Sequence, residues 1–265
     1  IDVILAVMAQ HRDSTKVQEK GCDVLGQVAC NNDATWPTIA EKGGIDIILT
    51  AMQQHPGSTK VQEYGCQALG IVAEFNSANQ RTIAEKRGID IILTAMQQYP
   101  VSVGVQSYGC YALGWVAYNN AATQRIIANK GGIQAAFRAM TQHRDREKVQ
   151  RWGCGVMYVM VDLESARPAM QKGKAVMDAA RKNFPNNADI EKYLNKVYAR
   201  AMEAEQEQGE QEAIQALQHA TKREDIDGIL AVMAQRRDRA EVQENGCAAL
   251  AVVAAASAAN QRTIA

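Results

Sequence analysis

VQEYGCQALGIVA, residues 61–73, decides the fold, because its first six residues return along the chain at a fixed spacing. Related hexapeptides are VQEKGC at 17–22, VQSYGC at 105–110, VQRWGC at 149–154 and VQENGC at 242–247. The steps from Cys22 to Cys66, Cys110 and Cys154 are each 44 residues long. Such a constant period predicts a chain of stacked supersecondary units that share one continuous core.

One complete unit, residues 44–86, is predicted to contain three helices. Apolar residues recur at helical spacing from Ile45 to about His55, and Pro56 prevents continuation of that helix. Ser58 or Thr59 can cap the next helix, whose packing positions are those of Val61, Gly65, Ala68 or Leu69, and Val72. A short helix, ANQRTIAEK at 78–86, completes the unit before the glycine of the next one.

These motifs resemble the armadillo repeat family. The resemblance is carried by Gly-Ile pairs at 44–45, 88–89 and 132–133, by the VQE openings, by ALGIVA and ALGWVA bodies, and by NQRTIA at 79–84 and 260–265. It is specific over 1–160 and 226–265 and weak between them. The resemblance implies an all-α, right-handed armadillo-like α-solenoid of about six 44-residue units, of which the fifth is degenerate.

The middle of the chain departs from the regular repeat. KNFP at 182–185 corresponds to QQHP at 53–56, so residues 174–203 read as the degenerate unit, in which Leu194 and Asn195 replace Gly-Cys. The following stretch, 203–225, is rich in Glu and Gln and is predicted to be a solvated helix that extends or replaces the usual short helix. We therefore expect three regions: regular repeats over 1–160, an irregular segment over 161–225 and a further truncated repeat over 226–265.

Composition excludes several classes of protein. The chain has 29 basic and 29 acidic residues, so no net charge favours nucleic acid as a partner. No apolar run approaches the roughly 18 residues of a membrane span, and no targeting signal is visible in the sequence. We expect a cytoplasmic location.

The cysteines and histidines occupy repeat positions and are interpreted structurally. One cysteine per unit places equivalent sulfur atoms about one helix diameter apart, roughly 10 Å, which is too far for a disulfide or a shared zinc ion. Gly-Cys instead supplies small side chains where helices approach closely, and Cys30 lies outside this register. His11, His55 and His143 share a helix end with Tyr99, so we expect capping and not catalysis. No motif indicates an enzyme, a cofactor or a metal.

In armadillo nomenclature, the helix that begins with the VQ pair is the third helix of a unit. A second stripe along this helix is predicted to lie outside the solenoid interior. In the second unit this stripe is Tyr64, Gln67, Ile71 and Glu74, and in SYGCYALGWVAY, 107–118, it becomes aromatic. The resemblance implies that third helices line a concave groove. Clustered exposed aromatic residues often mark binding sites, so the predicted partner-binding residues are Tyr64, Ile71, Tyr108, Tyr111, Trp115, Tyr118, Trp152 and Val159. An alternative is that these rings are covered within the chain.

Three functions remain open at this point. The first is a non-enzymatic scaffold or adaptor for partner proteins, and an apolar helix or loop fits best because the Asn that holds extended peptides in related arrays is replaced, for example by Ile71 and Trp115. The second is a helical-repeat carrier or lyase for a flat cofactor or pigment. Single-stranded nucleic acid ranks last, because the stripe offers three bases, Lys20, Lys196 and Arg200, against four acids, Asp23, Glu74, Asp162 and Glu203. The sequence does not identify the partner or the oligomeric state.

Overall fold

A computed structural model describes residues 1–30 and 39–256 of the chain, with side chains described over 1–28 and 39–256. Contacts divide the chain into two compact units, Ile1–Tyr198 and Ala199–Ala265. This division falls inside the segment that sequence analysis separated as 161–225. The described residues form helices and no strands, so the all-α class is confirmed.

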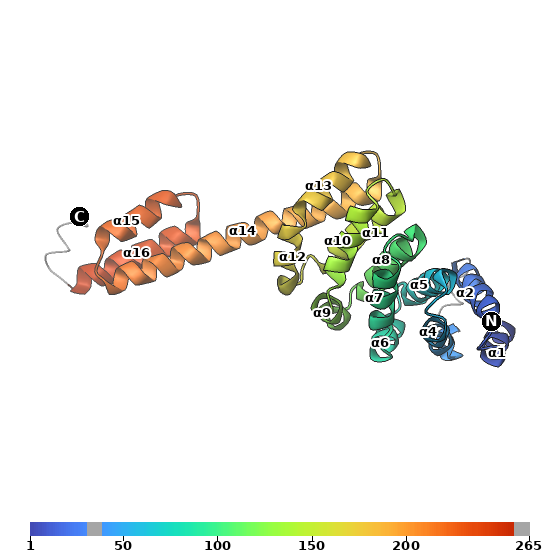
Figure 1. Ribbon diagram of the computed structural model, residues 1–265. Coiled ribbons are helices and arrows are strands. Elements are labelled where there is room, and N and C mark those ends of the chain that lie inside the picture. The colour runs from blue at the N-terminus through green and yellow to red at the C-terminus, as the bar shows by residue number, and fades with distance from the viewer. Residues whose placement is uncertain (31–38, 257–265) are drawn as a thin grey trace. The chain divides into compact units, whose positions relative to one another are not determined.

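The first compact unit contains two rows of helices (Figure 1). The longer helices are α2 (Thr15–Cys30), α5 (Thr59–Ala73), α8 (Val103–Ala117) and α11 (Glu147–Met160). The shorter row is α1 (Asp2–Gln10), α4 (Gly44–Gln54), α7 (Gly88–Gln98) and α10 (Gly132–Gln142). Within each row, successive helices pack side by side, so each 44-residue unit stacks on the one before it.

Shorter elements complete this compact unit. Two short helices of the repeat, α6 (Ser77–Glu85) and α9 (Ala121–Asn129), lie between the long ones. The degenerate part consists of η1 (Glu164–Ala166), α12 (Arg167–Lys172), α13 (Lys174–Asn183) and the first part of α14 (Ala188–Lys222). Ile190 and Leu194 on α14 are buried, as the predicted correspondence with Val61 and Gly65 requires.

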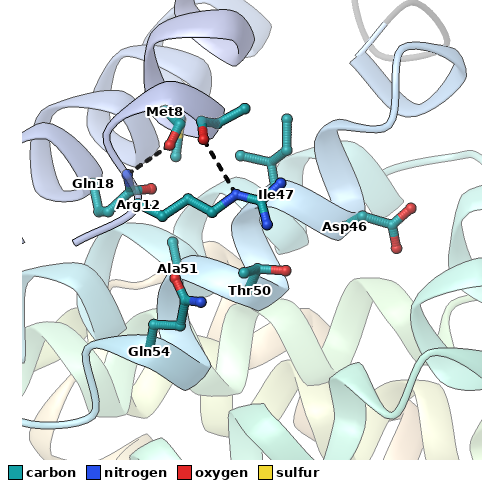
Figure 2. Close-up of a pocket in the computed structure, with 9 residues that line it drawn as sticks. Met8, Arg12, Gln18, Asp46, Ile47, Thr50, Ala51 and Gln54 are labelled. Carbon is teal, nitrogen blue, oxygen red and sulfur yellow. Dashed lines mark hydrogen bonds between the residues drawn. The ribbon is translucent and has the colours of Figure 1, made fainter. Parts of the chain in front are cut away.

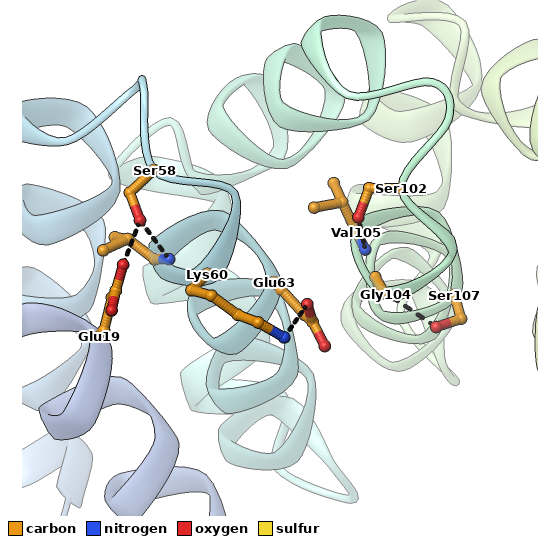
Figure 3. Close-up of polar contacts among 9 residues, drawn as sticks. Glu19, Ser58, Lys60, Glu63, Ser102, Gly104, Val105 and Ser107 are labelled. Atoms are coloured by element: carbon orange, nitrogen blue, oxygen red, sulfur yellow. Dashed lines mark hydrogen bonds and ion pairs between the residues drawn. The ribbon is translucent and has the colours of Figure 1, made fainter.

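Local sequence explains where the helices begin. The Ser58 hydroxyl accepts a hydrogen bond from Val61 N at 3.2 Å, and Ser102 caps α8 through Val105 N at 3.3 Å (Figure 3). Each cap satisfies a backbone donor that the first turn of a helix leaves unpaired. The predicted cap of the third helix is therefore confirmed at Ser58.

The glutamine of each VQ pair joins its own helix, in the longer row, to the preceding helix of the shorter row. The buried amide of Gln62 donates to Met52 O at 2.8 Å and to His55 O at 3.1 Å. These carbonyls belong to the last turn of α4 and have no partner within that helix. Gln18, Gln106, Gln150 and Gln243 make the same pair of hydrogen bonds in their own units. The repeated glutamine is therefore a side-chain cap for the preceding helix.

The repeated Gly-Cys pair allows those helices to touch. A Cβ atom at Gly65 would lie 2.5 Å from Cγ of Met52, and the glycines at 21, 109, 153 and 246 meet a methionine in the same way. Cys66 beside it is fully buried. Close packing of this kind tolerates no added methyl group without displacement. The predicted structural role of Gly-Cys is confirmed.

Polar contacts are made both within a unit and between successive units. Within the unit 44–86, Lys86 pairs with Asp46 at 2.8 Å, and Lys42 with Asp2 and Lys130 with Asp90 repeat this contact in their own units. The His55 ring contacts Arg12 O of the preceding unit through Nε2 at 2.6 Å, although its residue also stands at the helix end, as predicted. The position shared by histidine and tyrosine therefore connects two units and does more than cap one helix.

The second compact unit is built from the last part of α14 with α15 (Ile226–Gln235) and α16 (Ala240–Ala256). Its core contains Ala213, Leu217 and Ala220 from α14, packed with residues such as Ile229 and Val253. The prediction of a helix over 203–225 is confirmed for its greater part, up to Lys222, but the prediction that this helix is solvated is wrong for one face. Small apolar residues at helical spacing within the Glu-rich stretch explain this burial.

Candidate functional site

The predicted site residues lie on the row of long helices, but they are less exposed than expected. Tyr64, Tyr108, Tyr111, Trp115, Tyr118, Trp152 and Val159 are all half-buried. Ile71 is buried, so its predicted position outside the interior is wrong. The reason is lateral packing: Ile71 lies against α2, where a Cβ atom at Gly26 would be 3.7 Å from its Cδ1. The flank of one long helix becomes interior when the next helix packs beside it.

The aromatic residues contact one another directly. We define the aromatic cluster as Phe75, Tyr108, Tyr111, Trp115, Tyr118 and Trp152. Tyr111 lies 4.7 Å from Trp152, measured between ring centroids, and 6.3 Å from Trp115. Trp115 in turn lies 5.2 Å from Tyr118. Edge-to-face contacts at these distances are favourable, so the rings support one another as a connected surface.

Phe75, which follows α5, is a member of this cluster that the stripe analysis missed. Its ring meets Trp115 at 4.7 Å and Tyr118 at 5.5 Å, and yet 66% of the residue is exposed. Its backbone has a φ of 50°, in the left-handed region that a bulky residue rarely adopts. The residue lies one position beyond the stripe, after the end of the third helix, which is why helical spacing did not include it. Because Phe75 directly follows Glu74, the last residue of the predicted stripe, its place in the sequence could have indicated that it lies near the cluster.

Polar groups surround the aromatic cluster. Tyr111 donates its hydroxyl proton to Glu74 Oε2 at 3.1 Å, which holds that ring across two units. The Arg151 guanidinium lies 4.1 Å from the Trp152 ring centroid, a cation–π contact. Trp115 Nε1 is buried and has no hydrogen-bond partner among the described residues. The surface thus has an apolar centre with charged groups at its edge.

Ring orientation bears on the cofactor alternative. The planes of the cluster's contacting pairs are tilted by 59° to 84°. A flat cofactor held by stacking needs two roughly parallel walls separated by the thickness of the bound ring. The contacting pairs of the aromatic cluster do not provide such walls. The geometry therefore favours contact with the outer edge of the cluster over insertion between its rings.

Grooves with a mainly apolar lining lie along the row of shorter helices. One groove of about 90 Å³ lies between α1 and α4 and is lined by residues that include Arg12, Asp46 and Thr50 (Figure 2). A second, of about 300 Å³, lies between α4 and α7, where Asp90 and Thr94 stand 44 residues further along. The shared register shows that the grooves arise from the stacking of units.

The buried cysteines are unsuited to chemistry. Burial raises the pKa of Cys22, Cys110 and Cys154 to about 12, and it also raises the pKa of the Cys66 thiol. Cys247 is exposed, whereas the side chain of Cys30 lies outside the described residues. Within the described part of the chain, no three His, Cys, Asp or Glu side chains are grouped as metal ligands.

In the described ranges, every helix is too short or too polar to cross a membrane. The residues of NQRTIA at 260–265, predicted to open a further short helix, lie outside the described residues.

Stacked helix pairs with a lateral aromatic surface define a helical-repeat protein of the armadillo type. The sequence profile of the LRRK2 ARM repeat family matches residues 1–262, and the chain belongs to that family. A search of curated proteins finds no match. The crystal structure of an engineered protein, a Northeast Structural Genomics Consortium target, aligns with a TM-score of 0.63 at 14% identity and covers 95% of both chains. That similarity concerns the fold alone.

Proposed function

We propose that this chain is a non-enzymatic scaffold that binds a partner protein through the aromatic cluster. Membership of an ARM repeat family supports protein interaction as the general role. The partner we propose is an apolar helix or loop, because the centre of the cluster is apolar and its rings are too tightly packed to admit a stacked ligand.

Phe75 is the observation that carries this proposal. An exposed phenylalanine forgoes the free energy of burying its ring, about 2 kcal/mol. The left-handed φ at this position belongs to the repeat, because Asn119, 44 residues further along, has the same φ of 50°. Exposure of the Phe75 ring does not benefit the fold, since Trp115 and Tyr118 are supported by other rings as well. This exposure is explained if the ring becomes buried in a complex.

Phe75→Ala tests the proposal without disturbing the core. A photo-crosslinking residue at position 75 identifies the partner from a lysate of the source organism, and the affinity of the purified partner is then measured by calorimetry. We expect Phe75→Ala to weaken binding at least about 10-fold, as for an interface anchor. Tyr111→Ala is less suitable, because its ring packs on Gly70 and its hydroxyl contacts Glu74.

Val101→Ala is the matched control. Val101 is also an exposed apolar residue, but it lies in the turn before α8. Crosslinking from position 101 should not capture the partner, and Val101→Ala should leave its affinity unchanged. Equal affinities of the Phe75→Ala variant and the original chain would show that the aromatic cluster is not the binding surface.

The proposal extends to the hand of the superhelix, the number of units and the cellular compartment of the protein. We propose a right-handed superhelix of about six units; an experimental crystal structure of the intact chain tests this, and a left-handed array would contradict it. A reducing, cytoplasmic setting is supported by the five cysteines that are free thiols in the described part of the chain. Extensive disulfide formation in protein purified from its source would contradict it.

A further inference from the structure

The groove between α4 and α7 contains an arginine at a backbone position that favours glycine. Arg87 precedes α7 with a φ of 62°, in the left-handed region. The equivalent residues before α4 and α10 are Gly43 and Gly131, with φ values of 77° and 78°. Glu224, before α15 of the second compact unit, is the other departure from glycine. Any side chain at such a φ is less favourable than glycine, so Arg87 occupies its position at a cost to the fold.

The fold gains little from the Arg87 side chain in return. Its Nε lies 3.4 Å from Asp90 Oδ2, and the side chain is 80% exposed, so this ion pair adds little stability. Asp90 is also held by Lys130, whose Nζ lies 2.6 Å from Oδ1. The hydrogen bond from Lys130 is the main cause that lowers the pKa of the Asp90 carboxyl. Lys130 therefore balances the charge of Asp90, and the Arg87 guanidinium is a surplus positive charge at the groove.

The groove itself is large enough for a small molecule and is apolar beside Arg87. Its volume is about 300 Å³, whereas the groove between α1 and α4 has about 90 Å³. Met52, Ile91 and Ala95 supply apolar lining, and Arg87 and Asp90 are the charged lining residues. A guanidinium binds a carboxylate through two parallel hydrogen bonds. The lining therefore combines an anchor for a carboxylate with an apolar surface for a short carbon chain.

The surroundings of the groove favour a small molecule over a protein. A stable protein interface buries roughly 800 Å² on each partner and has an apolar centre. Among the described residues, the exposed large apolar side chains lie outside α4 and α7. These two helices instead expose polar side chains such as Gln53 and Gln97. Apolar contact is therefore limited to a ligand of about the size of the groove.

We propose that the groove between α4 and α7 binds a free short-chain carboxylic acid, whose carboxylate pairs with Arg87 and whose carbon chain lies on Met52 and Ile91. The groove lies along the row of shorter helices and shares no lining residue with the aromatic cluster. It gives the chain a small-molecule site that does not depend on the proposed protein-binding surface. Binding of the acid explains why an arginine occupies a position that suits glycine.

Titration of the intact chain with hexanoate tests this site. With methyl-labelled isoleucine and methionine, the NMR signals of Ile91 and Met52 should shift to saturation, with a dissociation constant on the order of 1 mM. The signal of Ile47, the counterpart of Ile91 beside the smaller groove, should stay in place. Hexanamide has nearly the same size and no charge, so it should bind at least about 10-fold more weakly. Equal binding of the amide, or the lack of a saturable shift with hexanoate, would overturn the proposal.

Arg87→Gly separates binding from folding. The variant restores the glycine of the neighbouring units, so the melting temperature should rise by about 2 °C while the affinity for hexanoate falls at least about 10-fold. Unchanged affinity would show that Arg87 is not the anchor. Gly43→Arg is the matched control, because a Cβ atom there meets nothing within 4 Å. It should lower the melting temperature and create no hexanoate site at Ile47.

A last probe distinguishes a free acid from the end of a protein chain. N-acetyl-leucine carries its carboxylate as the last residue of a peptide does, beside an amide and a branched side chain. We expect it to bind no more tightly than hexanoate, because the proposed ligand is an unbranched acid. Binding at least about 10-fold tighter than that of hexanoate would overturn the proposal, since the occupant would then be the carboxyl terminus of a partner protein.

Discussion

At the residue scale, the repeated hexapeptide combines three separate physical roles. Gln62 satisfies two helix-end carbonyls, Gly65 makes room for Met52, and Cys66 supplies a small, fully buried side chain. The sequence indicated the last two roles, because small residues recur where helices must approach. It did not reveal the role of glutamine, since a polar residue in a repeat is as compatible with solvent as with a buried carbonyl.

The cysteines give a prediction about reactivity. Because burial raises the pKa of Cys110 to about 12, its thiol stays protonated at pH 8 and is shielded from reagents, whereas Cys247 is exposed to them. Iodoacetamide should modify Cys110 at least about 100-fold more slowly than Cys247, as measured by peptide mass spectrometry. Comparable rates would show that the interior of the unit opens readily.

The same shift sets a dependence of stability on pH. Thiols of the unfolded chain ionise near their ordinary pKa of 9.0, whereas Cys110 in the folded chain holds its proton until about pH 12. The stabilisation that the buried Cys110 thiol contributes to the free energy of unfolding is therefore complete below pH 9 and is lost as the pH rises toward 12.

At the scale of elements, the contact between paired helices depends on glycine. A Cβ atom at Gly65 would lie 2.5 Å from Met52, while one at Gly57 in the preceding turn would meet nothing within 4 Å. Gly65→Ala should lower the free energy of unfolding by about 1–3 kcal/mol, and Gly57→Ala should change it by less than about 0.5 kcal/mol. Urea unfolding followed by tryptophan fluorescence measures both variants. Equal stabilities would mean that α4 and α5 can separate without cost.

The aromatic stripe shows how far helical spacing predicts a surface. It correctly grouped Tyr111, Trp115 and Tyr118, which contact one another as neighbours on one helix. It misjudged Ile71, because burial of a helix flank depends on the neighbouring helix and not on the helix itself. It also omitted Phe75, whose position is set by a left-handed turn that has no helical period.

At the scale of the whole molecule, α14 passes from one compact unit into the other, and its environment changes along its length. Met202 and Glu205 are exposed, whereas Leu217 and Ala220 are buried in the core of the second compact unit. Local opening is easiest where a helix buries least apolar surface. We therefore expect amides of 199–208 to exchange at least about 10-fold faster than those of 213–220. Uniform protection along the helix would contradict this prediction.

The sequence by itself determined the period, the helices, their caps and membership of an armadillo-type fold. Those features follow from local spacing and from residues such as Ser58 and Gly65, which act within one unit or at its helix ends. Only the tertiary structure decided which surfaces are covered: Ile71 is interior and Phe75 is exposed. The physical reason is that burial in a stacked array is a property of two adjacent units, whereas helical periodicity describes one helix at a time.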